Sequence, residues 1–375
     1  MRLVYLSPVP WASFAQRPQK FVEWFNLRTG GEVLWLDPYP TRLPQPSDLK
    51  RNCTALSTSE AQDHYPWLQV LRPRLLPVEP LPVISKINHI LFKRIIASIT
   101  SFTRGQEALI VVGKPSMLAI AVLDALEDVP SVYDAMDEFP AFYKGLSSLS
   151  MAERERQLVQ HVGHLWVTST RLGARWSKER PDLHMVPNGL DASFFAENGP
   201  RLSTNTSKVF GYVGTIASWF DWQWIIALAN ARPHDSIHII GPNFNPCDLA
   251  LPPNIQVLSA CSHKEAMLAM RSFDVGVIPF LRNQLTASVD PIKYYEYRAS
   301  GLPVISTAFG EMIHRESEPG IFISHSLEDI SELSANALTH HDPDSFTRDF
   351  AKEHCWHNRF DSTRILTKHQ AEPVT

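Results

Sequence analysis

One stretch of the second half places a lysine and a glutamate three residues apart at the start of an expected helix. Residues 290–306 read DPIKYYEYRASGLPVIS. Asp290 suits an N-cap, the proline after it suits a first helical turn, and Gly301 suits the helix end. The free N–H groups of the first turn can bind a diphosphate, and Lys293 can pair with its charge. Glu296 shares a face with Lys293 and can accept ribose hydroxyls, although an ordinary surface ion pair has the same spacing.

A second stretch places a glycine directly after an expected strand, where it could serve a ligand. Residues 209–213 form an expected strand, which is followed by Gly214 and Thr215. Glycine at a strand end lets backbone N–H groups approach a ligand closely, but it also serves as a simple turn. The chain contains neither GxGxxG nor GxxxxGK[ST], so the two common phosphate-binding fingerprints are excluded.

Carboxylates follow an expected strand in the first half of the chain. The sequence SVYDAMDEF over residues 131–139 puts Asp134 at the strand end, with Asp137 and Glu138 just beyond it. A carboxylate in this position could take a proton from a hydroxyl group. On these residues alone, the favoured interpretation is that Asp134 or Asp137 caps the segment that follows.

The elements that must position these residues alternate along the chain. Short β-rich apolar runs separated by helical stretches predict an α/β fold with parallel sheets covered by helices. Strands are expected at 3–6, 33–36, 108–112, 131–134, 165–168, 209–213, 236–240, 255–258, 275–278, 304–306 and 321–323. Helices are expected at 16–27, 116–126, 151–161, 169–178, 222–231, 264–271, 292–300, 327–338 and 350–368. The proline-rich residues 37–82 predict an irregular insertion.

Length and charge limit the organisation of the chain. The 375 residues, 44% of them apolar, are enough for two domains with separate cores. The turn at residues 187–189 suggests domains over 1–187 and 188–350, with 351–375 as a C-terminal helix. The net charge of −4 argues against nucleic-acid binding, and residues 1–187, with 21 basic and 18 acidic side chains, carry +3.

Membrane and metal signals are weak. No apolar run is long enough to span a membrane, and four scattered cysteines without zinc spacing fit a reducing, cytoplasmic location. Residues 83–102 are apolar and carry Lys86, Lys93 and Arg94. This stretch could lie on an anionic membrane surface, or it could be an amphipathic helix packed on the first domain.

Three segments together resemble a known group of enzymes. KYYEYRASGLPVI, residues 293–305, resembles the K-x-x-E-Y-x-x-x-G-x-P-V donor-site helix of GT-B fold glycosyltransferases. VPNGLD, residues 186–191, matches the stretch that enters their second domain. FGYVGTIASWFDW, residues 210–222, is similar to the opening of that domain in TuaH-like bacterial cell-surface polysaccharide transferases, and the RPQ at 17–19 recurs in the same group.

The resemblance implies a fold and a set of ligands. Two Rossmann-like domains would have parallel sheets that face an interdomain cleft, and the C-terminal helix would cross back to the first domain. The second domain would bind a nucleotide sugar, most often UDP-linked, and the first a saccharide or lipid-linked saccharide acceptor at the inner face of the cell membrane. No metal or other cofactor is implied, so the His340-His341-Asp342 and Asp342-Pro-Asp344 sequences are not assigned a metal.

The resemblance also assigns roles to single residues of the donor site. Lys293 would bind the donor phosphates and Glu296 the ribose. Gly214 and Thr215 would form the loop beneath the diphosphate, and Asp290 would belong to the same site.

The expected stereochemistry of the reaction rests on one difference from the retaining enzymes and on one further resemblance. Retaining GT-B enzymes carry a further glutamate eight positions before the ribose-binding one, where this chain has Ser288. The inverting glucuronosyltransferase of xanthan synthesis has an aspartate that acts as the base at the end of a strand similar to VYDAMD. Asp137 matches this aspartate, which leaves Asp134 as structural. An inverting transferase is therefore expected. A retaining transferase, a nucleotide-sugar epimerase and a non-catalytic nucleotide-binding protein are the alternatives.

Overall fold

The computed structural model describes residues 1–13, 16–41, 65–76, 79, 86–192, 207–343 and 345–366. The chain divides into two compact units, which are described separately below. The first unit contains Met1–Thr168, Leu172–Val186 and the residues from Thr363 onward, and the second contains Ser169–Arg171 and Pro187–Ser362.

The first unit is built on a parallel sheet. In the described part its order is β3-β2-β1-β4-β5-β6-β7, so the direction of strand addition reverses between β1 and β4. The strands are β1 (Arg2–Leu6), β2 (Glu32–Leu36), β3 (Leu68–Leu71), β4 (Ala108–Val112), β5 (Ser131–Ala135), β6 (His164–Val167) and β7 (His184–Met185). In open α/β sheets, ligands bind beyond the carboxyl ends of the strands where the order reverses.

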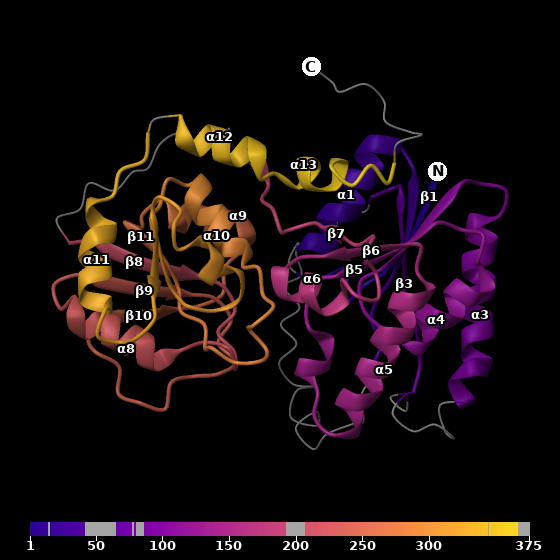
Figure 1. Cartoon of the computed structure of the whole chain (residues 1–375), viewed down its shortest axis with the longest axis horizontal. Coiled ribbons are helices and arrows are strands. Elements are labelled where there is room, and N and C mark those ends of the chain that lie inside the picture. The colour runs from indigo at the N-terminus through magenta and orange to yellow at the C-terminus, as the bar shows by residue number, and fades with distance from the viewer. Residues whose placement is uncertain are drawn as a thin grey trace. The chain divides into compact units, whose positions relative to one another are not determined.

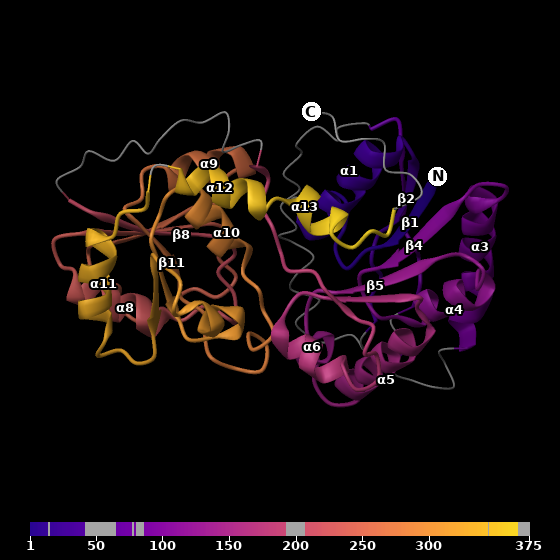
Figure 2. The ribbon, with the colours of Figure 1, turned by 45° about the horizontal axis from the view of Figure 1, so that its top comes forward.

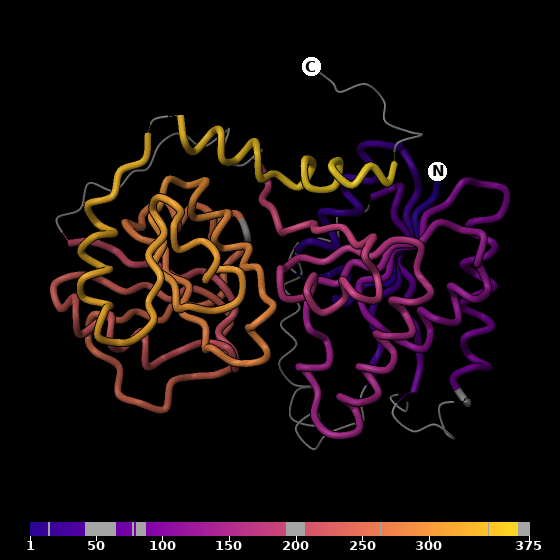
Figure 3. The backbone as a smooth tube through the Cα atoms, in the orientation of Figure 1, coloured from indigo at the N-terminus to yellow at the C-terminus, as the bar shows by residue number. Residues whose placement is uncertain are grey.

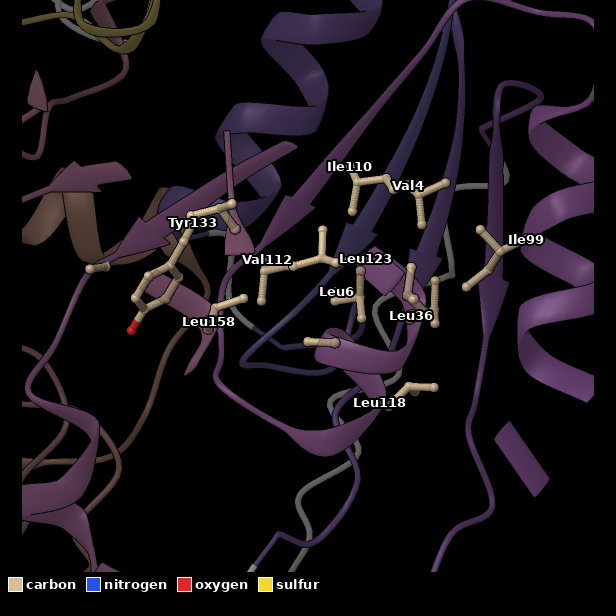
Figure 4. Packing of buried hydrophobic residues seen from close by; sticks show 14 of the residues in the cluster. Val4, Leu6, Leu36, Ile99, Ile110, Val112, Leu118, Leu123, Tyr133 and Leu158 are labelled. Atoms are coloured by element: carbon tan, nitrogen blue, oxygen red, sulfur yellow. The ribbon is translucent and has the colours of Figure 1, made fainter. Parts of the chain in front are cut away.

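Helices cover both faces of this sheet (Figure 1 and, turned by 45°, Figure 2). They are α1 (Arg17–Thr29), α3 (Lys86–Thr103), α4 (Met117–Ala125), η1 (Phe139–Phe142), α5 (Leu146–His161) and α6 (Thr170–Trp176). On the face of α1, Phe21 packs against Tyr5 of β1 and Trp166 of β6. On the other face, strand side chains such as Val4 and Val112 form one buried cluster with leucines of α4 and α5 (Figure 4).

Burial on both faces explains why the central strands of this sheet were predictable. The β4 sequence ALIVV is apolar at every position, and all five of its residues are buried. Continuous apolar runs of this kind are typical of parallel strands between two helical layers. Each fully buried Val or Leu side chain contributes roughly 1.5–3 kcal/mol relative to an exposed one.

The second unit repeats the topology with strand order β10-β9-β8-β11-β12-β13. Its strands are β8 (Val209–Val213), β9 (Ser236–Ile240), β10 (Ile255–Leu258), β11 (Val275–Ile278), β12 (Val304–Thr307) and β13 (Ile321–Ser324). Its helices are α8 (Trp222–Ala231), α9 (His263–Met270), α10 (Ile292–Ala299), η2 (Gly310–Arg315), α11 (Ile330–Thr339), α12 (Phe346–Glu353) and α13 (Trp356–Asp361). Residues of α8 and α11 belong to one buried cluster, and residues of α9, α10 and α12 belong to another.

Two expectations about elements are corrected. The insertion over residues 37–82 is not irregular throughout, because Leu68–Leu71 forms β3 and pairs with β2; its residues 42–64 lie outside the described part. The single helix expected over 350–368 is two helices, α12 and α13, as the chain path in Figure 3 shows. They separate because the His354 carbonyl accepts from Leu190 N and Trp356 N donates to the Leu190 carbonyl. These long-range bonds replace helical ones.

Candidate functional site

Helix α10 begins without a side-chain cap. Its N-cap is Pro291, with φ −76° and ψ 120°, and no side chain of the described residues bonds to the first turn as a cap. The prediction that Asp290 is the N-cap is therefore wrong. The positive end of the helix dipole and its free N–H groups remain available to an anion.

Asp290 instead anchors this segment inside the second unit. Its buried carboxylate accepts from Arg315 Nη2 at 2.7 Å, from Asn188 N at 2.7 Å and from the Tyr295 hydroxyl at 2.9 Å. Burial, reinforced by the Asp290 charge, raises the pKa of Tyr295 well above its usual value, so this hydroxyl stays a donor. The carboxylate is satisfied internally, which makes Asp290 a residue that positions α10.

Lys293 and Glu296 form an ion pair on α10. The Nζ–Oε2 distance is 2.5 Å. The lysine–glutamate ion pair, which was the alternative to a ligand site, is therefore present. It is not an ordinary surface pair, because the Glu296 side chain is only 8% exposed and the Lys293 side chain 23%. An anion bound at the start of α10 would compete for the ammonium group and release the carboxylate to accept hydroxyl groups.

The Gly214 loop is held beside α10 by a contact from the helix. Val213 N, at the end of β8, donates to the Tyr297 hydroxyl of α10 at 3.0 Å. Gly214 N then donates to the Ile240 carbonyl at 2.9 Å, and the Thr215 carbonyl accepts from the Tyr212 hydroxyl at 2.9 Å. The structure therefore brings the two predicted donor segments together in one unit.

Gly241 is a residue of this loop cluster that the sequence analysis missed. It follows β9 with φ +146°, and a Cβ there would lie 2.1 Å from the Gly214 carbonyl oxygen. Only glycine fits such an approach of two backbones. The Gly-Pro pair at 241–242 directly after an apolar strand was the available signal, but it does not show which other segment lies against it.

Ser288, at the position of the missing glutamate, is fully buried. Its hydroxyl has no hydrogen-bond partner among the described residues.

Asp137 and Asp134 have opposite environments in the first unit. Asp134 is fully buried, and its two oxygens accept from Arg17 Nε and Nη2, each at 2.8 Å. This buried pairing with Arg17, which the sequence did not indicate, is consistent with the structural role expected for Asp134. Asp137 is partly buried, and its carboxylate has no hydrogen-bond or ion-pair partner among the described residues. It does not cap η1, whose N-cap is Glu138 and lacks a side-chain bond.

Burial raises the pKa of Asp137 from 3.8 to about 6. An unpartnered carboxylate with this pKa is mostly ionised at pH 7 and is a better proton acceptor than an ordinary aspartate. The segment that carries it is fixed at both ends. The Met136 carbonyl accepts from Thr168 Oγ1 at 2.9 Å, and Glu138 lies 3.8 Å from Arg175.

The histidine and aspartate residues at 340–342 have a structural role. The Asp342 carboxylate pairs with Arg298 Nη2 at 2.6 Å and contacts His340 Nε2 at 2.9 Å. Asp344 lies outside the described residues. Within the described ranges, no three side chains of the ligating types gather where a metal ion could be held.

Comparison with known proteins gives one curated relative. No family model matches the chain. TuaH of Bacillus subtilis (strain 168), named as a teichuronic acid biosynthesis glycosyltransferase, is 25% identical over 197 residues. The match spans 47% of this chain and half the length of the relative.

Solved structures match over nearly the whole chain. Sucrose-phosphate synthase from Thermosynechococcus elongatus aligns with a TM-score of 0.67 at 13% identity, covering 98% of this chain and 99% of its own. HepE of Anabaena, in complex with UDP and glucose, aligns with a TM-score of 0.65 at 12% identity and the same coverage. The chain has the GT-B fold. The α/β class and the two Rossmann-like domains expected from the sequence are thereby confirmed.

A third GT-B structure extends the comparison. The α,α-trehalose-phosphate synthase from Burkholderia xenovorans aligns with a TM-score of 0.59 at 11% identity, covering 99% of this chain and all of its own. Among the described residues of this GT-B chain, no helix has the length and apolar character needed to cross a membrane.

Proposed function

We propose that the protein is a glycosyltransferase of bacterial surface polysaccharide synthesis. It moves a sugar from a UDP-linked donor to a hydroxyl of a saccharide or lipid-linked saccharide acceptor. The observation that carries the proposal is the start of α10, where an uncapped helix end, Lys293 and the buried Glu296 form a site suited to a nucleoside diphosphate. The likeness to TuaH and the UDP bound in HepE support the reaction class and the nucleotide.

In the donor complex, the diphosphate lies at the uncapped end of α10. It draws the Lys293 ammonium away from Glu296, and the freed carboxylate accepts the two ribose hydroxyls. Gly214 and Thr215 supply the backbone beneath the phosphates, and Asp290 keeps α10 in place through Arg315. Because the helix end and one lysine compensate the diphosphate charge, the reaction requires no metal ion.

In the transfer step, Asp137 acts as the general base. The acceptor oxygen forms a bond to the anomeric carbon as its proton passes to the Asp137 carboxylate. The bond from that carbon to the diphosphate breaks, and the leaving group carries away the electron pair. The product has inverted stereochemistry. The absence of a partner on the Asp137 carboxylate among the described residues and its raised pKa support this role.

Contact with the membrane is a further part of the proposal. Phe92, Ile95 and Ile99 of α3 are buried in the core of the first unit, so the apolar face of this helix is already used. The exposed face carries Lys93 and Arg94. Attachment would therefore be electrostatic, without insertion of the helix, and would bring the enzyme to lipid-linked acceptors.

A nucleotide screen tests the proposed function. A bound nucleotide at 100 times its Kd stabilises the fold by about 2.7 kcal/mol, which is measurable as a rise in melting temperature. We expect UDP to give a larger rise than GDP or dTDP, and the rise with UDP to persist in EDTA. No rise with any of the three nucleotides would contradict the donor site.

Two product analyses separate the alternatives. Incubation with UDP-GlcNAc alone leaves the sugar unchanged if the protein is a transferase, whereas an epimerase converts it. The anomeric configuration of a transfer product, measured by NMR, separates inversion from retention.

A further inference from the structure

The residue before Pro291 has the local properties of a helix N-cap, yet it does not cap α10. Aspartate is among the best N-cap residues, and its negative charge suits the positive end of a helix dipole. With Asp290 as the N-cap, its carboxylate would accept from the backbone N–H of Ile292 or Lys293. The structure places the N-cap at Pro291 instead, and no side chain of the described residues caps the first turn.

Arg315 of η2 holds the Asp290 side chain away from the helix end. Its Nη2 donates to Asp290 Oδ1 at 2.7 Å and to the Tyr295 hydroxyl at 2.8 Å. Its Cζ lies over the Tyr294 ring, 3.8 Å from the ring centroid. Arg315 is therefore fixed against two tyrosines of α10, and the pairing with Arg315 replaces the contact that the helix end offers to the Asp290 carboxylate.

Asn188 holds the backbone of the same aspartate. Its side-chain Nδ2 donates to the Asp290 carbonyl oxygen at 2.7 Å, and its backbone N donates to Asp290 Oδ2 at 2.7 Å. Arg359 Nε of α13 in turn donates to the Asn188 carbonyl at 3.1 Å. Both the backbone and the side chain of Asp290 are thus bound by groups that lie outside α10.

The pairing with Arg315 also decides the charge that a ligand meets at the start of α10. Glu296 is already paired with Lys293, and Asp290 is paired with Arg315. An unpaired Asp290 would add an excess negative charge beside the helix end. A carboxylate that capped the helix would occupy N–H groups of the first turn and would also repel a diphosphate.

We propose that Arg315 is a positioning residue of the donor site and that Asn188 assists it. By holding Asp290 away from the N-cap position, Arg315 leaves the first turn of α10 to the diphosphate of the donor. The inference rests on the proposed function, because it concerns the same nucleotide site. Arg315 acts through Asp290 and is not assigned a contact with the nucleotide.

Calorimetric titration of the full chain with UDP and with uridine tests this proposal. Arg315→Met removes the charge that pairs with Asp290 and keeps much of the side-chain length. We expect this variant to bind UDP at least about 10-fold more weakly, which is the effect of one lost charge-assisted hydrogen bond. Uridine has no phosphate and should bind to this variant as it does to the wild type, because the helix end contributes only to binding of the phosphates.

A second substitution separates this positioning role from a general structural one. Asp290→Asn in the Arg315→Met background removes the carboxylate charge and keeps an acceptor oxygen for Asn188 N. Asparagine can still cap a helix, but as a neutral group it does not repel a diphosphate. If the released carboxylate causes the loss, the double variant should regain most of the wild-type affinity for UDP. If the ion pair only stabilises the fold, removal of its second partner should restore nothing.

Asn188→Ala provides a second measurement if Arg315→Met does not fold. It removes the bond to the Asp290 carbonyl but keeps the backbone bond to Oδ2, so it should weaken UDP binding roughly 2- to 10-fold, the range for a neutral hydrogen bond, and leave uridine binding unchanged. Arg232→Met is the matched control, because Arg232 Nη2 pairs with Asp235 at 2.6 Å beyond the end of α8 in the same unit. This control should bind both ligands like the wild type.

The proposal is wrong if Arg315→Met binds UDP as the wild type does, if it loses as much affinity for uridine as for UDP, or if the double variant regains nothing. Where Arg315→Met does not fold, wild-type UDP affinity in Asn188→Ala overturns the proposal. The wild-type titration separates this result from the proposed function. No binding of UDP by the wild-type chain would overturn the donor site and this inference with it, whereas UDP binding that Arg315→Met retains in full would overturn the positioning role alone.

Discussion

Replacing Asp137 by asparagine should lower activity and raise stability at the same time. Asparagine keeps the size of the side chain but cannot accept the acceptor proton. Loss of a general base typically lowers the rate 10²–10⁴-fold. Donor affinity should stay near that of the wild type, because the donor residues belong to the other compact unit.

The stability change follows from the pKa of Asp137. Burial raises it from 3.8 to about 6, a difference of about 2 units. At 1.36 kcal/mol per unit, the ionised carboxylate costs the folded state up to about 3 kcal/mol above pH 6. The folded pKa is the higher one, so the stability associated with protonated Asp137 is full below pH 3.8 and is lost as the pH rises through about 6.

Two measurements check this prediction. Transfer rates at saturating donor should fall for the wild type as the pH drops below about 6, since the ionised base is lost. Urea unfolding should show Asp137→Asn to be more stable than the wild type at pH 7, with the difference vanishing below about pH 4. If Asp137→Asn retains most of its transfer rate, the inverting mechanism is refuted. If it is less stable than the wild type at pH 7, the account of its burial is refuted.

The other predictions concern the anchor, the donor helix and the membrane. Asp134→Asn should destabilise the fold by about 3–5 kcal/mol in urea unfolding, because it removes the negative charge of a buried ion pair; wild-type stability would contradict this. In calorimetry, Lys293→Ala should weaken the binding of UDP but not of uridine, and Glu296→Ala should weaken the binding of both by about 1.5–3 kcal/mol. Wild-type affinity in both variants would contradict the donor site. Liposome flotation should recover the protein with anionic vesicles at low salt, and less of it after Lys93→Ala and Arg94→Ala; equal recovery with neutral vesicles would oppose an electrostatic contact.

The sequence alone predicted most of the helices and strands and the residues whose side chains could bind a ligand or react. Central strands such as β4 and β8 are buried at every position because helices cover both of their faces, and their apolar pattern is local to each strand. The spacing of Lys293 and Glu296 at the start of a helix is also a local property of the sequence. Asp137 was identified by its place after a strand and by resemblance, and its part in the reaction stays a prediction.

Edge strands and helix ends depended on tertiary contacts. Strand β3 has exposed residues at its centre, so it lacks the apolar signal of the buried strands and forms through its pairing with β2. Asp290 has the local features of an N-cap, yet Arg315 and Asn188 hold its carboxylate elsewhere. A favourable N-cap side chain stabilises a helix by about 1 kcal/mol, and several buried hydrogen bonds to the same carboxylate outweigh that contribution.

The electrostatic character of the candidate sites was likewise decided by the tertiary structure. Arg17 and Asp134 are 117 residues apart, and only the folded sheet brings them into contact. That contact supports a structural role for Asp134, while Asp137, three residues later, has a raised pKa and a carboxylate without a partner among the residues that the structure describes. Two aspartates of one short segment thus differ in pKa and in partners, because burial and pairing depend on residues far away in the sequence. The periodic pattern of a sequence indicates only which face of each helix or strand is covered.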